Sequence, residues 1–301
     1  MADNTAAATG RIIAAHGQHG ILETASGDER RYVVKGRRLR VVCGDRVCWS
    51  EQIHGSTVLI SSILSRHNVL ERQPPGQTKP EVLAANLTCL VAVFAPVPAP
   101  DWFLIDRYLC AAELMGCRVL LVGNKNDLAF ARAADEAEIQ DYVRLGYAVL
   151  SVSATNGDGV QQLAEAMKSE TGIVVGQSGV GKSSLINQLV PDAGIIVGAV
   201  SRATAEGIHT TTASAMHQLP GGGRLIDTPG VRDFVPAIRE ATRVQNGFPE
   251  ILAAADGCRF NNCQHLREPD CAVKQRRDAG QISGRRYEAY KRLLRSAARA
   301  S

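Results

Sequence analysis

The sequence predicts an α/β protein in which a mostly parallel sheet, covered by helices on both faces, is flanked by a strand-rich module and a small helical region. Three observations predict this arrangement. Short β-branched segments separated by turn residues fill residues 1–71, apolar strands alternate with helical segments over 72–236, and a cysteine cluster lies among helical segments over 237–301. These three ranges are the predicted domains, and a chain of 301 residues is long enough to form them.

Composition excludes several classes of protein. The chain is 45% hydrophobic and 21% charged, as is typical of globular domains rather than of disordered or collagen-like chains. Its best apolar run, 87–95, is much shorter than the roughly 18 residues that a membrane span needs. The N-terminus carries an early acid and lacks the features of a secretory signal. We therefore expect a cytoplasmic protein with no membrane partner and with reduced cysteines.

Residues 1–71 are expected to form a small β-barrel. Short β-branched strands recur at barrel-like spacing, at 11–13, 31–34, 46–49 and 57–63. The segment Arg72–Pro80 then supplies three prolines and a glycine, which indicates a linker or an exposed loop. We place a domain boundary there.

The middle of the chain alternates strands with helices, which predicts a parallel sheet with ligands at the carboxyl ends of its strands. Strands are expected at 87–94, 119–122, 148–152, 172–175, 213–219 and 224–226, and helices near 106–115, 131–145, 160–167 and from 182. After Pro236 the strands cease. The last segment, from a cap at Ser283, reads as an amphipathic basic helix.

Basic residues gather at both ends of the chain. From Lys274 onward there are nine basic residues, including Arg285 and Arg286, and only two acidic ones. A second basic run lies near the N-terminus, at Arg30, Arg31, Lys35, Arg37, Arg38 and Arg40. This distribution suits contact with an extended polyanion at both ends, and a solvated charged surface is the alternative.

The segment GQSGVGKS, between a strand and a helix, is the strongest motif and predicts a P-loop. Its glycines let backbone N–H groups surround phosphate oxygens, Lys182 reaches the β and γ phosphates, and Ser183 ligates magnesium. The predicted binding residues are Gly176, Gln177, Ser178, Gly179, Val180, Gly181, Lys182, Ser183 and Ser184.

Three further loops predict that the nucleotide is GTP. In DTPG, Asp227 can hold magnesium through water and Gly230 can present its N–H to the γ phosphate. In NKND, Asp127 can accept the two guanine N–H groups that adenine does not present in that arrangement, while Asn124 bridges loops and Lys125 covers the ring. After the next strand come Ser153 and Ala154, whose backbone N–H can donate to guanine O6.

With these four motifs the chain resembles the translation-factor-related GTPases, but its motifs come in a different order. NKND and the Ser153–Ala154 loop precede GQSGVGKS, HTTT and DTPG, so the domain reads as circularly permuted. The segment after DTPG, which responds to the γ phosphate in such proteins, leads directly into the cysteine-rich tail. Nucleotide state can therefore be transmitted to that tail.

The tail carries the pattern C-x4-C-x-H-x5-C, formed by Cys258, Cys263, His265 and Cys271. Three thiolates and one imidazole complete a tetrahedral zinc ion with no open position, which predicts a structural site. A region with so small a core gains most from such a metal. Buried free thiols with an exposed histidine are the alternative.

The strand-rich module, the permuted motifs and the Cys3His tail together resemble the small ribosomal subunit biogenesis GTPase family, RsgA. The resemblance extends to AAN at Ala84–Asn86 and DRYL at Asp106–Leu109. It implies an N-terminal OB-fold and a late-stage assembly factor that binds GTP or GDP, zinc, magnesium, the 30S subunit and its 16S rRNA. It also implies GTP hydrolysis stimulated by the subunit, and we expect a monomer.

The catalytic group is expected in the segment between the P-loop and DTPG. Val231 occupies the position where Ras-like enzymes place a water-orienting glutamine, so another residue must orient water, and His209 is the candidate. Thr210 or Thr211 ligates magnesium in the GTP state, and the resemblance favours Thr211. Two other functions stay open: a GTP-sensing RNA-binding module with incidental hydrolysis, and a zinc-bearing nucleic-acid protein with a decayed nucleotide site.

Overall fold

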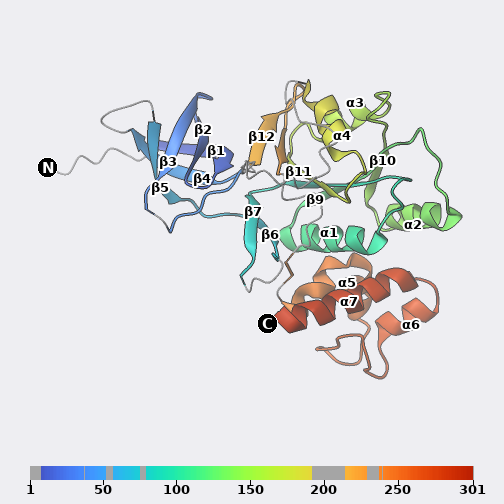
Figure 1. Cartoon of the computed structure of the whole chain (residues 1–301). Coiled ribbons are helices and arrows are strands. Elements are labelled where there is room, and N and C mark those ends of the chain that lie inside the picture. The colour runs from blue at the N-terminus through green and yellow to red at the C-terminus, as the bar shows by residue number, and fades with distance from the viewer. Residues whose placement is uncertain are drawn as a thin grey trace, which may run out of the picture.

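The computed structural model describes residues 8–36, 38–51, 57–74, 79–191, 214–228, 237–238 and 240–300. Within these ranges an N-terminal barrel, a central sheet with helices, and a C-terminal group of helices follow one another (Figure 1). No helix in the described part is long and apolar enough to cross a membrane.

The barrel confirms the predicted strand-rich module. Its strands pair in the order β1-β2-β3-β5-β4, and β4 closes onto β1. Only the β3–β5 pairing is parallel. These strands are β1 (Ala8–His16), β2 (His19–Thr24), β3 (Glu29–Val34), β4 (Arg46–Glu51) and β5 (Thr57–Ile63). The sequence missed β2, because Leu22 is its one fully buried side chain and the alternation of polar and apolar residues is faint.

The central sheet confirms the predicted α/β class. Five parallel strands lie in the order β10-β9-β8-β11-β13, and β12 (Ser214–Gln218) pairs antiparallel with β13. The five are β8 (Cys89–Phe94), β9 (Arg118–Gly123), β10 (Ala148–Ser151), β11 (Thr171–Gly176) and β13 (Arg224–Asp227). Strand β12 also pairs with β1, where Ala215 lies opposite Ala14. Barrel and central sheet therefore share one continuous run of strands.

Helices cover both faces of this sheet, so β8 is apolar at every position. Its residues Leu90, Ala92 and Phe94 belong to the same apolar cluster as α1 (Trp102–Met115) and the α2 residue Tyr142, while Val91 and Val93 belong to the cluster containing Leu185. The remaining helices are α2 (Ala133–Arg144), α3 (Val160–Ala166) and α4 (Lys182–Leu189).

The proline-rich segment after residue 72 connects two paired strands. β6 (Val69–Arg72) and β7 (Glu81–Ala85) form a separate antiparallel pair on either side of it. The predicted domain boundary thus falls at the end of β6, and residues 75–78 lie outside the described ranges.

The C-terminal region consists of short helices and one long helix, packed beneath α1 in Figure 1. They are a 3-10 helix (Ala241–Gly247), α5 (Pro249–Ala255), α6 (Ala272–Asp278) and α7 (Gly284–Ala300). As the amphipathic pattern predicts, Tyr287, Tyr290, Leu293 and Leu294 of α7 are buried.

Two arginines counted in the basic tail are not available to an external polyanion. Arg286 is fully buried and donates from Nη1 to Asp106 Oδ1 at 2.8 Å and from Nε to Glu250 Oε1 at 2.6 Å. Arg285 pairs with the other oxygen of Asp106 and with Glu138. Burial alone would lower the pKa of Arg286, but the carboxylates raise it well above its usual value. This part of the charge run holds α7 against α1.

Candidate nucleotide and metal sites

The predicted P-loop lies where the sequence places it, between β11 and α4. β11 ends at Gly176 and α4 begins at Lys182. The Lys182 ammonium donates to the carbonyls of Gly176 at 2.6 Å and Gln177 at 2.5 Å, so it lies folded over the loop. Ser183 and Ser184 are in the first turn of α4, where free N–H groups and the helix dipole favour an anion.

The NKND loop touches the P-loop directly, although the two are more than fifty residues apart. The Asn124 side-chain amide donates to Val180 O at 2.8 Å, and the Lys125 ammonium donates to Gly179 O at 2.7 Å. Gly181 has a φ of +90°, and a Cβ there would lie 2.3 Å from Asn124 Nδ2. Glycine is required at this position so that the two loops can meet.

The loop after β10 joins the same group. Ser153 donates to Asp127 Oδ1 at 2.6 Å, which holds that carboxylate at the site. The Ala154 N–H, which the sequence assigns to guanine O6, here donates to Asn124 Oδ1 at 3.0 Å. The sequence offered no sign of a further contact, in which Gln188 of α4 donates to Ala154 O at 3.0 Å.

The DTPG motif begins at the same edge of the sheet. Asp227 ends β13, which runs parallel to β11 and lies beside it. The carboxyl ends of β8, β9, β10, β11 and β13 share this edge, where open α/β sheets bind ligands. Four of the sequence-predicted residues, His209, Thr210, Thr211 and Gly230, lie outside the described ranges, as does Val231.

The four predicted zinc ligands gather within one small cluster, in which all ligand atoms lie within 4.8 Å of one another. The Cys258 and Cys271 sulfurs are 3.8 Å apart, and each lies 3.5 Å from His265 Nδ1. With zinc–sulfur bonds of about 2.3 Å and zinc–nitrogen bonds of about 2.05 Å, tetrahedral zinc separates two sulfurs by about 3.8 Å and sulfur from nitrogen by about 3.6 Å. These side chains therefore fit zinc.

The surroundings of the cluster favour metal binding by His265. Burial lowers the pKa of this imidazole, which favours its neutral form. Nε2 lies 3.3 Å from Gln245 Oε1, and a hydrogen bond donated by Nε2–H to this oxygen leaves Nδ1 free to bind a metal. Tyr287 and Tyr290 donate to the carbonyls of His265 and Gln264 at 2.5 and 3.0 Å. The cluster is thereby attached to α7.

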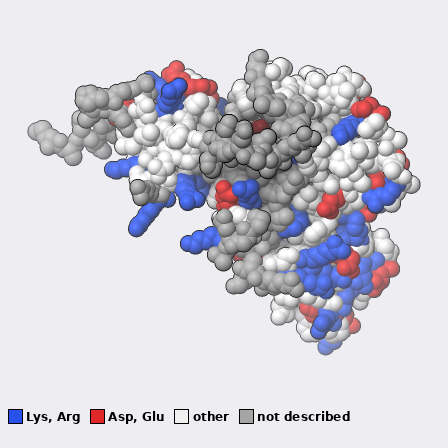
Figure 2. Space-filling model, viewed as in Figure 1, with Lys and Arg blue, Asp and Glu red and all other residues white. Residues whose placement is uncertain are grey.

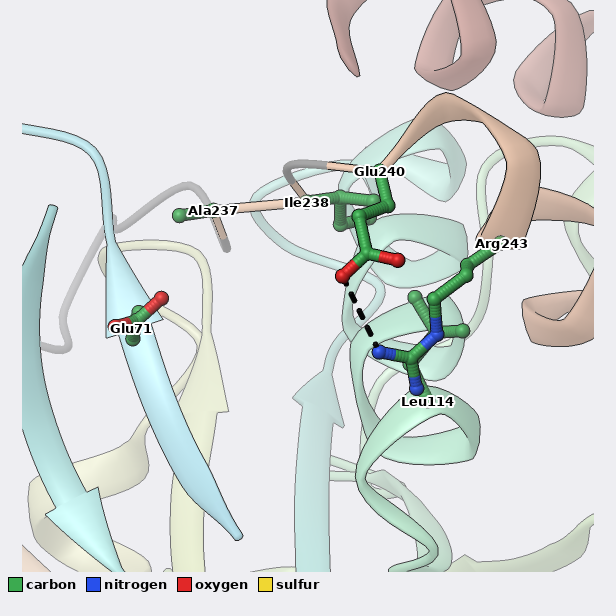
Figure 3. A pocket seen from close by; sticks show the side chains of 6 residues that line it. All are labelled: Glu71, Leu114, Ala237, Ile238, Glu240 and Arg243. Atoms are coloured by element: carbon green, nitrogen blue, oxygen red, sulfur yellow. Dashed lines mark ion pairs between the residues drawn. The ribbon is translucent and has the colours of Figure 1, made fainter. Parts of the chain in front are cut away.

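A pocket of about 310 Å³ lies away from both sites (Figure 3). Glu71 of β6 faces it from one side, and Glu240 and Arg243 from the other, where they form an ion pair at 3.6 Å. Ala237 donates its N–H to Glu71 O at 3.0 Å, which brings the chain that follows DTPG back to β6. Of the predicted site residues that the structure describes, none lines this pocket.

Comparison with known proteins gives a consistent result. A sequence profile described as RsgA GTPase matches residues 63–235. A protein of Azotobacter vinelandii named small ribosomal subunit biogenesis GTPase RsgA is 43% identical over 258 residues, which are 85% of this chain and 75% of that protein. One of the same name from Ectopseudomonas mendocina is 40% identical over 294 residues, covering 96% and 85%.

Two solved structures have the same fold. The crystal structure of YjeQ from Thermotoga maritima superposes with a TM-score of 0.73 at 26% identity, covering 97% of this chain and 98% of that one. The structure of YloQ, described as a circularly permuted GTPase, also gives 0.73, at 22% identity, covering 100% and 98%.

Proposed function

Because this chain belongs to the RsgA GTPase family, it is a GTPase of small ribosomal subunit biogenesis, and we propose how its residues bind nucleotide, hold metal ions and meet the subunit. The domain ranges 1–71, 72–236 and 237–301 are part of this proposal. The contact of Asn124 and Lys125 with the P-loop carries it, because that contact joins a guanine-reading loop to a phosphate-binding loop.

The base and the phosphates occupy opposite ends of one site. Asp127, held by Ser153, accepts the N–H groups of guanine, and the Lys125 stem covers the ring. Guanine O6 competes with Asn124 for the Ala154 N–H. Lys182 leaves the carbonyls of Gly176 and Gln177 for the β and γ phosphates, while the N–H groups of residues 177–184 surround the phosphate oxygens.

Ser183 and Asp227, with Thr211, hold magnesium in this proposal. The ion would neutralise charge on the β and γ phosphate oxygens. Gly230 presents its N–H to the γ phosphate, and His209 orients the attacking water. Since Val231 cannot do so, hydrolysis by the isolated protein is slow and is stimulated by the small subunit.

Zinc is the ion that we assign to Cys258, Cys263, His265 and Cys271, on the fit of their spacing to a tetrahedron. It would act as a structural cross-link. Burial raises the pKa of the Cys263 thiol to about 12, so the thiolate form there requires a cation.

The partner is the 30S subunit and its 16S rRNA, which a cytoplasmic monomer meets through basic surfaces. Figure 2 shows Lys and Arg side chains gathered over the region that α6 and α7 occupy in Figure 1. Exposed or half-exposed examples are Arg276, Arg277, Lys291, Arg292 and Arg295. Such side chains favour phosphate contacts without reading sequence.

Phosphate release by the full chain, with and without purified 30S subunits, tests the proposal. We expect at least about tenfold stimulation, which corresponds to lowering the activation free energy by roughly 1.4 kcal/mol. A smaller stimulation at saturating subunit favours the alternative of a GTP-sensing RNA-binding module, which the basic surfaces also suit.

Replacement of Asp127 tests the base-binding role. Asp127→Asn should weaken GTP binding by about a hundredfold, since hydrogen bonds to a charged group contribute about 1.5–3 kcal/mol each. It should bind xanthosine triphosphate better, because the new amide can donate to the oxygen that replaces the guanine amine. Asp158→Asn, the same change at an exposed residue nearby, is the control. Unchanged preference for GTP over ATP in Asp127→Asn would contradict the assignment.

A further inference from the structure

A pocket of about 360 Å³, which we call the junction pocket, lies where the barrel meets the central sheet. Residues at the start of β1, the end of β2 and the start of β4 line it, together with Leu64 and Arg224, the first residue of β13. The β1–β4 register places Arg46 beside Arg11, so the barrel residues gather near the start of β1 and the end of β2. The β1–β2 turn, one of the loops that barrels of this type use for nucleic acid, lies at the other end of these two strands.

Two arginines face each other in this pocket. Arg11 of β1 and Arg46 of β4 are direct partners in the antiparallel β1–β4 pairing, and both line the pocket. Like charges placed directly opposite each other destabilise a sheet. Within the described ranges, neither guanidinium has an ion pair with a carboxylate.

Glu23, the one carboxylate among the described residues that line the pocket, is already engaged. Glu23 lies opposite Arg11 across β1–β2, but its oxygens accept from Arg224 Nη2 at 2.8 and 3.1 Å. Arg224 thus pairs with Glu23 across the junction, and the lining side chains retain an excess of two positive charges. Since no other described carboxylate lines the pocket, an anion from outside can neutralise the Arg11–Arg46 pair.

We propose that the junction pocket binds a phosphate group of the RNA backbone, with Arg11 and Arg46 as its ligands. Guanidinium groups bind phosphate oxygens with paired, charge-assisted hydrogen bonds. Leu64, 37% exposed at the pocket wall, offers an apolar surface to the adjoining ribose. RNA is favoured over a small anion because this inference rests on the proposed function, in which the partner is a ribonucleoprotein.

The test measures binding of the full chain to purified 30S subunits over a series of salt concentrations. Removing one phosphate contact should lower the slope of log affinity against log salt by about one. We expect Arg11→Gln/Arg46→Gln to weaken binding roughly tenfold with this change of slope. Its thermal unfolding midpoint should stay the same or rise, because the opposed charges are gone.

Two further variants separate charge from geometry. Arg144→Gln/Lys168→Gln removes the same charge from exposed surface ion pairs outside the pocket and should change affinity less than about twofold. Arg11→Lys/Arg46→Lys should keep the salt slope but lose part of the affinity, because lysine lacks the paired donors.

Each outcome has a distinct consequence. If the wild-type chain fails to bind 30S subunits, the proposed function itself fails. If it binds and the glutamine variant matches the exposed-pair control, only the pocket assignment is overturned. With GDP saturating the P-loop, stabilisation by inorganic phosphate that needs Arg11 and Arg46, with subunit affinity unchanged in the variant, would indicate a free-phosphate site and overturn the RNA assignment.

Discussion

The barrel and the C-terminal helices are attached to the central sheet in opposite ways. The barrel is attached through main-chain pairing, because β1 pairs antiparallel with β12, with Ala14 opposite Ala215 and Ala15 opposite Ser214. The C-terminal helices are attached through buried charges, because Asp106 of α1 pairs with both Arg285 and Arg286 of α7.

This difference determines how each attachment can fail. Backbone hydrogen bonds between strands are made whatever the side chain is. The stabilisation that they give is therefore divided among the paired residues, and one substitution removes little of it. A buried ion pair places most of the dependence on a few atoms, and removal of one partner leaves an uncompensated charge. We therefore expect single substitutions to disrupt the C-terminal attachment much more than the N-terminal one.

The largest effect is expected when the Cys3His cluster loses a ligand for the proposed metal ion. Cys271→Ala removes a ligand, and structural zinc in small peptide domains contributes about 10–16 kcal/mol of apparent binding free energy. Since Tyr287 and Tyr290 attach the cluster to α7, we expect α7 to loosen from α1 while the barrel stays folded. Limited proteolysis with metal analysis checks this, with Cys48→Ala of the barrel as control. Full protection of the C-terminal region without metal would contradict it.

Asp106→Ala should have the next largest effect. It leaves the fully buried Arg286 with Glu250 alone and deprives Arg285 of a partner, at a cost of about 3–5 kcal/mol in unfolding free energy. Urea unfolding measures the change. Asp141→Asn, in an exposed pair with Arg144, should cost at most about 0.5 kcal/mol.

Two further substitutions sharpen this result. In Asp106→Ala/Arg286→Met/Glu250→Gln the buried guanidinium and its second carboxylate partner are removed as well, so the loss should be smaller than for Asp106→Ala alone. Additive losses in the triple variant would show that these side chains do not act as one unit.

The contrast between the two attachments also explains what the sequence could predict. The loops of the nucleotide site follow strands and carry residue types tied to phosphate, magnesium and guanine, so their arrival at one sheet edge follows from a parallel sheet. The Cys3His cluster is contained within fourteen residues, 258–271, and its spacing predicts tetrahedral metal ligands. The fold class and the family follow from the same motifs.

The attachments could not be predicted, because they depend on partners far apart in the chain. In the sequence, Arg285 and Arg286 belong to a basic run suited to an external polyanion or to solvent, since nothing local distinguishes a buried arginine from an exposed one. The pairing of β1 with β12 joins residues about two hundred positions apart. Gln188 likewise reaches Ala154 only because α4 packs beside that loop.

On the N-terminal side, Cys43→Ala is expected to have a modest effect. The Cys43 thiol is fully buried and donates to Ser214 O at 3.1 Å, at the point where the barrel meets β12. Burial raises its pKa to about 12, so it stays protonated as a weak donor. Loss of this contact and of the sulfur's packing should cost about 1–2 kcal/mol in urea unfolding. A loss as large as that of Asp106→Ala would refute the proposed contrast.

The smallest effect is expected at the ion pair across the junction. Glu23 and Arg224 are each about a quarter exposed, so Glu23→Gln should change the unfolding free energy by at most about 1 kcal/mol. The substitution also removes repulsion between Glu23 and Glu29, which lie opposite each other across β2–β3. The lost attraction is thereby partly offset.

The direction in which stability changes with pH shows whether attraction to Arg224 or burial beside Glu29 dominates at Glu23. Burial, together with Glu29, raises the pKa of Glu23 in the folded chain above its ordinary 4.5. The folded chain then binds the proton more tightly than the unfolded one, so ionisation of Glu23 opposes folding as the pH rises through that raised value. Glutamine removes this dependence. The stability of Glu23→Gln relative to wild type should therefore increase from about pH 4 to pH 7 in paired urea titrations, whereas a decrease would mean that attraction to Arg224 prevails over burial.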